Sequence, residues 1–136
     1  MNFVLAIDDE PRRYWRLART LAKRDIGLVV TCRMEEVRFY LCEANYQICG
    51  VLLDHDMPFQ DGAYFVDFWL RERSIPVVVS SHNRPAAERL RATLEEWAVP
   101  VVCAPVVDPG HNERGLELYA RWERKALDHF RIWEEP

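Results

Sequence analysis

The chain has 136 residues, a formal net charge of −4 and 49% apolar residues. This length predicts one domain over residues 1–136 with a substantial core. The mild negative charge argues against binding of duplex DNA and against a polybasic membrane anchor. No apolar run approaches the roughly 20 residues that span a bilayer, and the N-terminus lacks the basic region and long apolar stretch of a signal peptide. We therefore expect a soluble, cytoplasmic protein.

The cysteine pattern agrees with that expectation. Cys32, Cys42, Cys49 and Cys103 form no Cys-x-x-Cys pair, and no His lies at zinc-finger spacing from them. We expect free thiols in a reducing compartment, in preference to disulfides or a structural zinc.

Five short apolar runs alternate with amphipathic segments along the chain. The runs are rich in β-branched residues and lack polar alternation, as strands buried on both faces do. They cover residues 3–7, 28–31, 50–53, 77–79 and 101–104.

Helical patterns fill the intervals between these strands. Pro11 follows an acidic stretch and suits a first helical turn, after which Trp15, Ala18 and Ala22 fall on one face. Apolar residues at helical spacing also mark residues 34–41, 63–73, 87–97 and about 112–130. We expect the aromatic side chains on these faces to belong to the core.

This alternation predicts a doubly wound α/β fold with a five-stranded parallel sheet and right-handed crossovers. We expect the strand order 2-1-3-4-5, in which the first, third and fourth strand ends are neighbours. In such sheets ligands bind outside the carboxyl ends of the strands, at the topological switch point.

Carboxylates gather at two of those three strand ends. Asp8 and Asp9 follow the first run, and Asp54 and Asp56 follow the third. Their hard oxygen atoms suit Mg²⁺ or Mn²⁺ with water and phosphate completing the shell. Close carboxylates repel unless a cation neutralises them, which favours a bound ion. For Asp9 the alternative is a cap of the helix that starts at Pro11.

Two histidines stand at the same predicted edge. His55 adjoins Asp54, and His82 adjoins Ser81 after the fourth strand. A metal-bound water beside a His of near-neutral pKa makes a phosphodiesterase centre plausible, and two histidines can open a 2′,3′-cyclic phosphate as acid and base. The alternative is that both are structural or solvated. Arg84 begins the next helix and either assists with phosphate or is a solvated first-turn residue.

These strand-end residues resemble the receiver domain of bacterial response regulators. Asp8-Asp9 resembles its acidic pair, and Asp54 its phosphoacceptor. Ser81 resembles the strand-four residue that contacts the phosphoryl group. The motif Asp-x-x-Met-Pro-x-x-Asp-Gly is present over residues 54–62, and the resemblance covers about residues 3 to 130. It implies the flavodoxin-like (βα)5 receiver fold.

Departures from that pattern point to a divergent branch. A receiver has a Lys at the end of strand five, where this chain has Ala104-Pro105, and the only later lysine is Lys125. The segment Leu53-Asp54-His55-Asp56 is similar to the cyclic-phosphate processing receiver-like family, and Ser81, Asn83 and Arg84 match roughly. That family has its strand-four His before the Ser, whereas here Ser80 stands there and His82 follows.

Three functions follow from these patterns. The first is a metal-dependent phosphodiesterase or cyclic phosphate hydrolase acting on an RNA end or another phosphate-bearing small molecule, with Asp54, His55, Ser81, His82 and Arg84 as its catalytic residues. The second is a stand-alone response regulator phosphorylated on Asp54. The third is a pseudo-receiver that docks a partner protein. None of them involves a membrane or duplex DNA.

Overall fold

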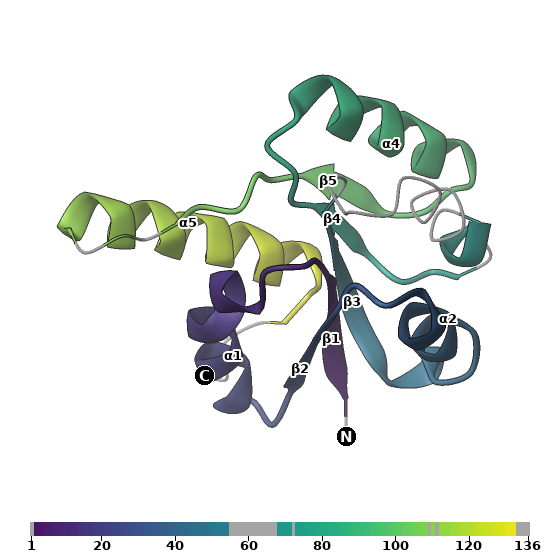
Figure 1. The fold of residues 1–136 in the computed structure, drawn as a ribbon, viewed down its shortest axis with the longest axis horizontal. Helices are drawn as coiled ribbons and strands as arrows, with labels where there is room; N and C mark the ends of the chain where they lie inside the picture. Colours follow the sequence, from purple (N-terminus) through teal and green to yellow (C-terminus); the bar gives the residue numbers. More distant parts are fainter. Residues whose placement is uncertain (1, 55–67, 72, 109, 111, 133–136) are drawn as a thin grey trace.

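The computed structural model describes residues 2–54, 68–71, 73–108, 110 and 112–132. Five parallel strands form one sheet in the order β2-β1-β3-β4-β5 (Figure 1). The predicted fold class and strand order are therefore confirmed. The strands are β1 (Phe3–Ile7), β2 (Gly27–Thr31), β3 (Ile48–Leu53), β4 (Val77–Val79) and β5 (Val101–Cys103).

Strand boundaries differ slightly from the sequence-based prediction. β2 and β3 begin before the predicted residues 28 and 50, because Gly27 and Ile48 both pair with Phe3 of β1. β5 ends at Cys103, before the predicted residue 104. Ala104 still donates its N–H to Val79 O at 2.9 Å, so the ladder continues one residue beyond the strand.

Helices cover both faces of the sheet. Figure 1 shows α1 and α5 on one side and α2 and α4 on the other. Each pair closes over its own layer of buried apolar side chains. The helical elements are η1 (Pro11–Tyr14, a 3₁₀ helix), α1 (Trp15–Ala22), α2 (Met34–Cys42), η2 (Asn45–Gln47), α4 (Arg84–Glu96) and α5 (Glu113–His129). Of the helix predicted over 63–73, residues 68–70 are helical, and residues 63–67 and 72 lie outside the described part.

The predicted buried face of α1 is wrong. Leu17 and Leu21 are fully buried, whereas Trp15 is 49% exposed. The buried stripe is instead formed by Tyr14, Leu17 and Leu21 at positions i, i+3 and i+7. The Trp15 ring instead contacts the guanidinium groups of Arg16 and Arg19 at the surface.

Four other aromatic side chains of the described residues are also largely exposed, namely Phe39, Tyr46, Phe68 and Trp97. Phe68 and Trp97 both contact the guanidinium of Arg71. All four cysteines are free and partly buried. Among the described residues no helix is long and apolar enough to cross a bilayer.

Candidate active site

Backbone hydrogen bonds beyond the strand ends position the candidate site. Asp8 N–H donates to Thr31 O at 3.1 Å, and Asp54 N–H donates to Ile7 O at 3.0 Å. Ser80 N–H donates to Leu53 O at 2.9 Å. The sheet ladder therefore extends one residue past β1, β3 and β4 and fixes the backbone of three polar residues at one edge.

Three carboxylates meet at this edge. One oxygen from each of Asp8, Asp9 and Asp54 lies within 4.8 Å of the other two. Asp8 is 1% exposed and Asp54 4% exposed, while Asp9 is exposed. Asp56, the fourth predicted metal ligand, and His55 lie outside the described residues. We name the set of Asp8, Asp9 and Asp54 the acidic pocket.

Asp8 is the most constrained member of the acidic pocket. Its Oδ1 accepts the Glu10 N–H at 2.9 Å, and its Oδ2 accepts the Tyr14 hydroxyl at 2.6 Å. Burial raises the pKa of Asp8, and the nearby Asp54 carboxylate adds to that rise. The Tyr14 and Glu10 donors and the Arg13 charge lower the same pKa without cancelling the effect of burial. A cation bound in the pocket would offset the cost of keeping the buried Asp8 carboxylate charged beside Asp54.

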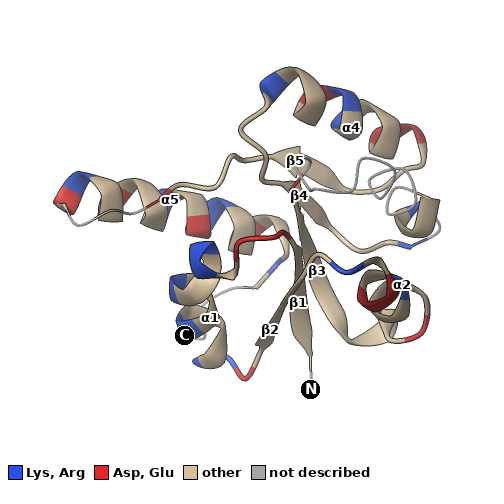
Figure 2. Ribbon diagram, viewed as in Figure 1, with Lys and Arg blue, Asp and Glu red and all other residues tan. Residues whose placement is uncertain are grey.

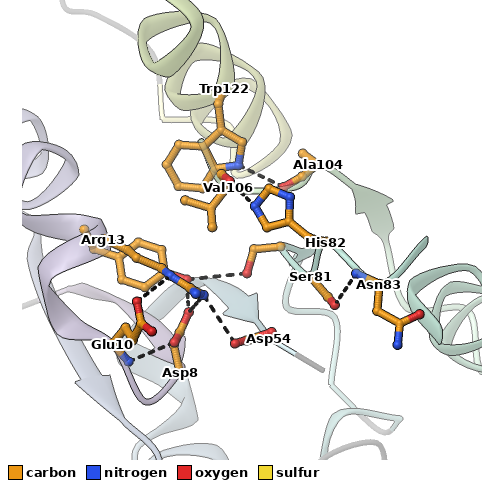
Figure 3. Close-up of polar contacts among 12 residues, drawn as sticks. Asp8, Glu10, Arg13, Asp54, Ser81, His82, Asn83, Ala104, Val106 and Trp122 are labelled. Carbon is orange, nitrogen blue, oxygen red and sulfur yellow. Dashed lines mark hydrogen bonds and ion pairs between the residues drawn. The ribbon is translucent and has the colours of Figure 1, made fainter. Parts of the chain in front are cut away.

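Arg13 lies across the two buried carboxylates (Figure 3). Its Nη1 is 3.3 Å from Asp8 Oδ2 and 3.5 Å from Asp54 Oδ2, and its Nε is 3.1 Å from Glu10 Oε2. These carboxylates raise the pKa of the guanidinium, although burial opposes the rise. The guanidinium is therefore a fixed positive charge inside the acidic pocket.

The two serines after β4 have different partners. Ser80 Oγ lies 3.4 Å from the Tyr14 hydroxyl, so it joins the network around Asp8. Ser81 Oγ accepts the Asn83 N–H at 3.1 Å and so shapes the turn into α4. Both serines are buried. Ser81, the predicted phosphoryl contact, thus has a local structural bond at the edge where the prediction places it.

His82 has a backbone partner away from the carboxylates, and Arg84 is exposed at the start of α4. His82 Nε2 lies 2.5 Å from Val106 O, and Figure 3 shows the ring directed toward the chain after β5. Within the described residues, neither side chain forms a hydrogen bond or ion pair with Asp8 or Asp54. The His82 ring is directed toward Val106, and the catalytic roles predicted for His82 and Arg84 therefore stay predictions.

The end of β5 is closed by aromatic packing. Ala104 is 2% exposed, and its carbonyl accepts the Trp122 Nε1–H at 2.9 Å. The Trp122 ring centroid lies 6.2 Å from that of Tyr14. Lys125 donates to Cys103 O at 3.2 Å, so its ammonium is held at the backbone of β5. Among the described residues, the side-chain cation that contacts the acidic pocket is therefore Arg13 of η1, and Lys125 binds elsewhere.

Arg13, Tyr14 and Ser80 are pocket residues that the sequence patterns did not indicate. All three contribute to the network around Asp8, and two of them belong to η1. A signal was present in the sequence. Pro11 fixes a tight helical start directly after the acidic pair, which returns the side chains of the next turn toward the strand end.

The acidic pocket fits a hard divalent cation. Mg²⁺ prefers a few carboxylate oxygens with water completing an octahedron, and the three oxygen atoms are close enough to share one ion after small side-chain movements. Arg13 contacts the same Oδ2 atoms, so a cation and the guanidinium would compete for them. The donor set alone does not select between Mg²⁺ and Mn²⁺.

Solved structures of response regulator receivers have a similar architecture. A response regulator receiver protein from Burkholderia phymatum matches with a TM-score of 0.63 and 19% identity, and the match covers 100% of both chains. The chain has the receiver fold. A response regulator of red light signalling in R. palustris matches with a TM-score of 0.60 and 17% identity over 100% of this chain and 99% of that one.

A third structure extends this comparison. The receiver domain of TorR, a response regulator of a TMAO respiratory system, matches with a TM-score of 0.59 and 17% identity over 95% of this chain and 99% of that one. No protein-family model and no curated protein sequence matches the chain. At these identities the receiver fold is established, and the chemistry of the site depends on this chain's own residues.

Proposed function

We propose that the acidic pocket is a metal-dependent phosphoryl-acceptor site with Asp54 as the acceptor, and that the protein works as a receiver-type signalling module. One observation carries the proposal. Asp54 is buried at the end of β3, with one of its oxygens within 4.8 Å of oxygens of Asp8 and Asp9. A carboxylate nucleophile beside a cation-binding pair is the equipment that such a transfer needs.

In the proposed reaction an Asp54 oxygen attacks the phosphorus of a phosphodonor. The bond between phosphorus and the donor's leaving group breaks, the leaving group departs with the electron pair, and Asp54 becomes an acyl phosphate. Mg²⁺ or Mn²⁺ held by Asp8, Asp9 and Asp54 would neutralise the charge on the phosphoryl oxygens. The buried Asp8 and Asp54 supply most of the ligand charge.

Arg13 supports the same proposal. An ordinary receiver provides a Lys from strand five, and Ala104 offers no charge there. The guanidinium of Arg13 already lies 3.5 Å from Asp54 Oδ2. We infer that it supplies the missing cation to the phosphorylated state, since fixed positive charge stabilises developing phosphoryl charge in a water-poor site.

The test is phosphorylation by a small-molecule donor. The purified chain is incubated with acetyl phosphate with and without Mg²⁺, and the modified residue is mapped by mass spectrometry. We expect an adduct on Asp54 that requires Mg²⁺. Asp54→Asn should abolish the adduct, and Asp108→Asn, which alters an exposed carboxylate, should leave it unchanged. The absence of any adduct with Mg²⁺ would refute the proposal and favour a pseudo-receiver that only docks a partner protein.

A second candidate function is hydrolysis of a 2′,3′-cyclic phosphate on an RNA end or nucleotide. The sequence Leu53-Asp54-His55-Asp56 favours it, as does Ala104 in place of the lysine. The contact of His82 with Val106 O counts against it, because a general acid or base must reach the substrate. We therefore rank it below phosphoryl acceptance.

Turnover of 2′,3′-cyclic AMP with Mg²⁺ or Mn²⁺ tests this second candidate. Activity that disappears in His55→Ala and in Asp54→Asn would support it. If activity survives both His55→Ala and His82→Ala, the two-histidine mechanism is wrong. An inactive protein that still forms the Asp54 adduct would leave phosphoryl acceptance as the sole function.

A further inference from the structure

A groove rich in positive charge lies between α1 and α5. Its volume is about 690 Å³. Figure 2 shows Lys and Arg recurring along α1 beside α5. The chain carries a net charge of −4, so a local excess of cations is not expected from composition. The charged residues that line this cationic groove are Arg16, Arg19, Lys23, Arg24, Arg124, Glu123 and Asp128.

Three of the cations form a row on one side of the groove. Arg16, Arg19 and Lys23 stand at positions i, i+3 and i+7 on α1 and its C-terminal cap, a spacing that places them on one helix face. The row spans about 10 Å at 1.5 Å per residue. A single phosphate would meet only part of such a row, whereas a chain of two or three phosphates would meet most of it.

These cations lack carboxylate partners in the described part of the chain. No ion pair there involves Arg16, Arg19, Lys23 or Arg124. The Nε atom of Arg16 is buried and has no hydrogen-bond acceptor. Elsewhere on the helix surfaces, Arg121 pairs with Glu117 at 3.0 Å and Arg91 pairs with two glutamates. Arg38 and Arg89 have no ion pair within the described residues either, so it is the clustering of unpaired cations that distinguishes the groove. A buried donor without an acceptor is costly, so the Arg16 side chain gains from any rearrangement that gives this nitrogen an acceptor.

Apolar side chains complete the groove. Leu116, Leu127 and Ile132 line it together with the ring of Tyr119. The Tyr119 hydroxyl accepts the Leu17 N–H at 3.1 Å, so the ring is held in place. The groove's volume falls in the range of roughly 300–1,000 Å³ that small-molecule sites have, and most of its lining is polar or charged. The groove therefore offers space for an organic body next to a row of phosphate-binding side chains.

We propose that the cationic groove binds a nucleoside di- or triphosphate. The phosphates meet Arg16, Arg19 and Lys23, since guanidinium groups bind phosphate oxygens through paired, charge-assisted hydrogen bonds. The nucleoside lies against the apolar side chains from α5. This site is on the α1–α5 face and is independent of phosphorylation at Asp54.

Calorimetric titration of the full chain with ADP and ATP tests this proposal. EDTA in the buffer removes divalent cations, so the acidic pocket cannot hold the nucleotide through a metal. We expect saturable binding that Arg16→Gln and Lys23→Gln each weaken by about tenfold, the effect of losing a hydrogen bond to a charged group. Arg121→Gln is the matched control, because it removes one charge from α5 outside the groove. Asp54→Asn should bind as the wild type does.

The outcomes separate the proposal from its competitors. Adenosine should bind far more weakly than ADP if the phosphates meet the cations. Tighter binding of an oligoglutamate peptide than of ATP would overturn the proposal in favour of an acidic protein partner. Equal loss in Arg121→Gln and Arg16→Gln would reveal nonspecific charge attraction, and no saturable binding at millimolar nucleotide would also overturn it. Circular dichroism of each variant confirms that the fold is retained.

Discussion

Arg13 Nη1 lies 3.5 Å from Asp54 Oδ2 and bridges the ends of β1 and β3. The same nitrogen contacts Asp8 Oδ2, so one guanidinium serves both buried carboxylates. An arginine cannot lose its charge under physiological conditions. The pocket thus contains a permanent cation where the proposed metal would bind, and the two cations must share the carboxylate oxygens.

This competition makes the affinity for metal depend on Arg13. In Arg13→Gln the guanidinium no longer occupies the Oδ2 atoms of Asp8 and Asp54, so we expect Mg²⁺ to bind roughly two- to fivefold more tightly, the range of a partly exposed ion pair. Phosphorylation of Asp54 at saturating Mg²⁺ should become slower, because the phosphorylated state loses a cation. Calorimetric Mg²⁺ titration and the rate of adduct formation measure the two effects.

A charge-preserving variant is the control for this prediction. Arg13→Lys keeps the positive charge but lacks the fork that reaches both carboxylates and Glu10, so its metal affinity should fall between those of the wild type and the Arg13→Gln variant. Unchanged Mg²⁺ affinity in Arg13→Gln would show that the guanidinium and the metal do not compete.

We expect Asp54→Asn to be more stable than the wild type without Mg²⁺ and less stable than the wild type with Mg²⁺. Without metal, the variant removes one of two neighbouring buried carboxylates, and we expect a gain of about 1 kcal/mol in the free energy of unfolding, as when strained functional sites are relaxed. With Mg²⁺ at ten times its dissociation constant, the wild type should gain about 1.4 kcal/mol.

Urea unfolding with and without Mg²⁺ measures both effects. The stability of Asp54→Asn should respond little to Mg²⁺, whereas Asp108→Asn, a change at an exposed carboxylate, should behave as the wild type does. A wild type that Mg²⁺ fails to stabilise would argue against a metal site in the acidic pocket.

Ala104→Lys places the receiver lysine at the end of β5, and we expect it to destabilise the protein. Ala104 is 2% exposed and packs in the layer that contains Tyr14 and Trp122. A longer side chain at this buried position must displace neighbouring side chains of that layer, which typically costs about 1–3 kcal/mol. Chemical denaturation measures the loss, and Ala92→Lys on the exposed face of α4 is the control. A stable Ala104→Lys protein would mean that the lysine finds room to reach the carboxylates.

The fold was predictable because its strands are apolar throughout. Val51–Leu53 and Val77–Val79 are buried on both faces, and such runs between amphipathic segments occur in parallel sheets. The same pattern located Asp8 and Asp54, since each follows directly after its strand. The buried face of α1 was also available in the sequence, because Tyr14, Leu17 and Leu21 are apolar at positions i, i+3 and i+7 and all three are fully buried.

The side-chain network of the site was harder to predict for a physical reason. Arg13 and His82 are both polar residues near a strand end, and sequence alone does not say which of them is directed toward the acidic pocket. Arg13 turns toward the carboxylates because charge attracts it, whereas His82 finds a carbonyl acceptor at Val106. The roles predicted for Ser81 and Arg84 stay predictions, and those of His55 and Asp56 concern residues outside the described part of the chain.

We expect Tyr14→Phe to lower the free energy of unfolding without Mg²⁺, and to lower it by less when Mg²⁺ is present. The Tyr14 hydroxyl donates to Asp8 Oδ2 at 2.6 Å, and its loss leaves a buried carboxylate short of a donor at a cost of about 1–3 kcal/mol. Mg²⁺ bound to Asp8 would replace that donor, so the deficit in the free energy of unfolding should shrink when Mg²⁺ is present. Tyr119→Phe removes another buried hydroxyl, one that accepts the Leu17 N–H, donates to the Arg13 carbonyl at 3.5 Å and contacts no carboxylate. Its deficit should be the same with and without Mg²⁺. Equal deficits for Tyr14→Phe under both conditions would mean that Asp8 does not bind the metal.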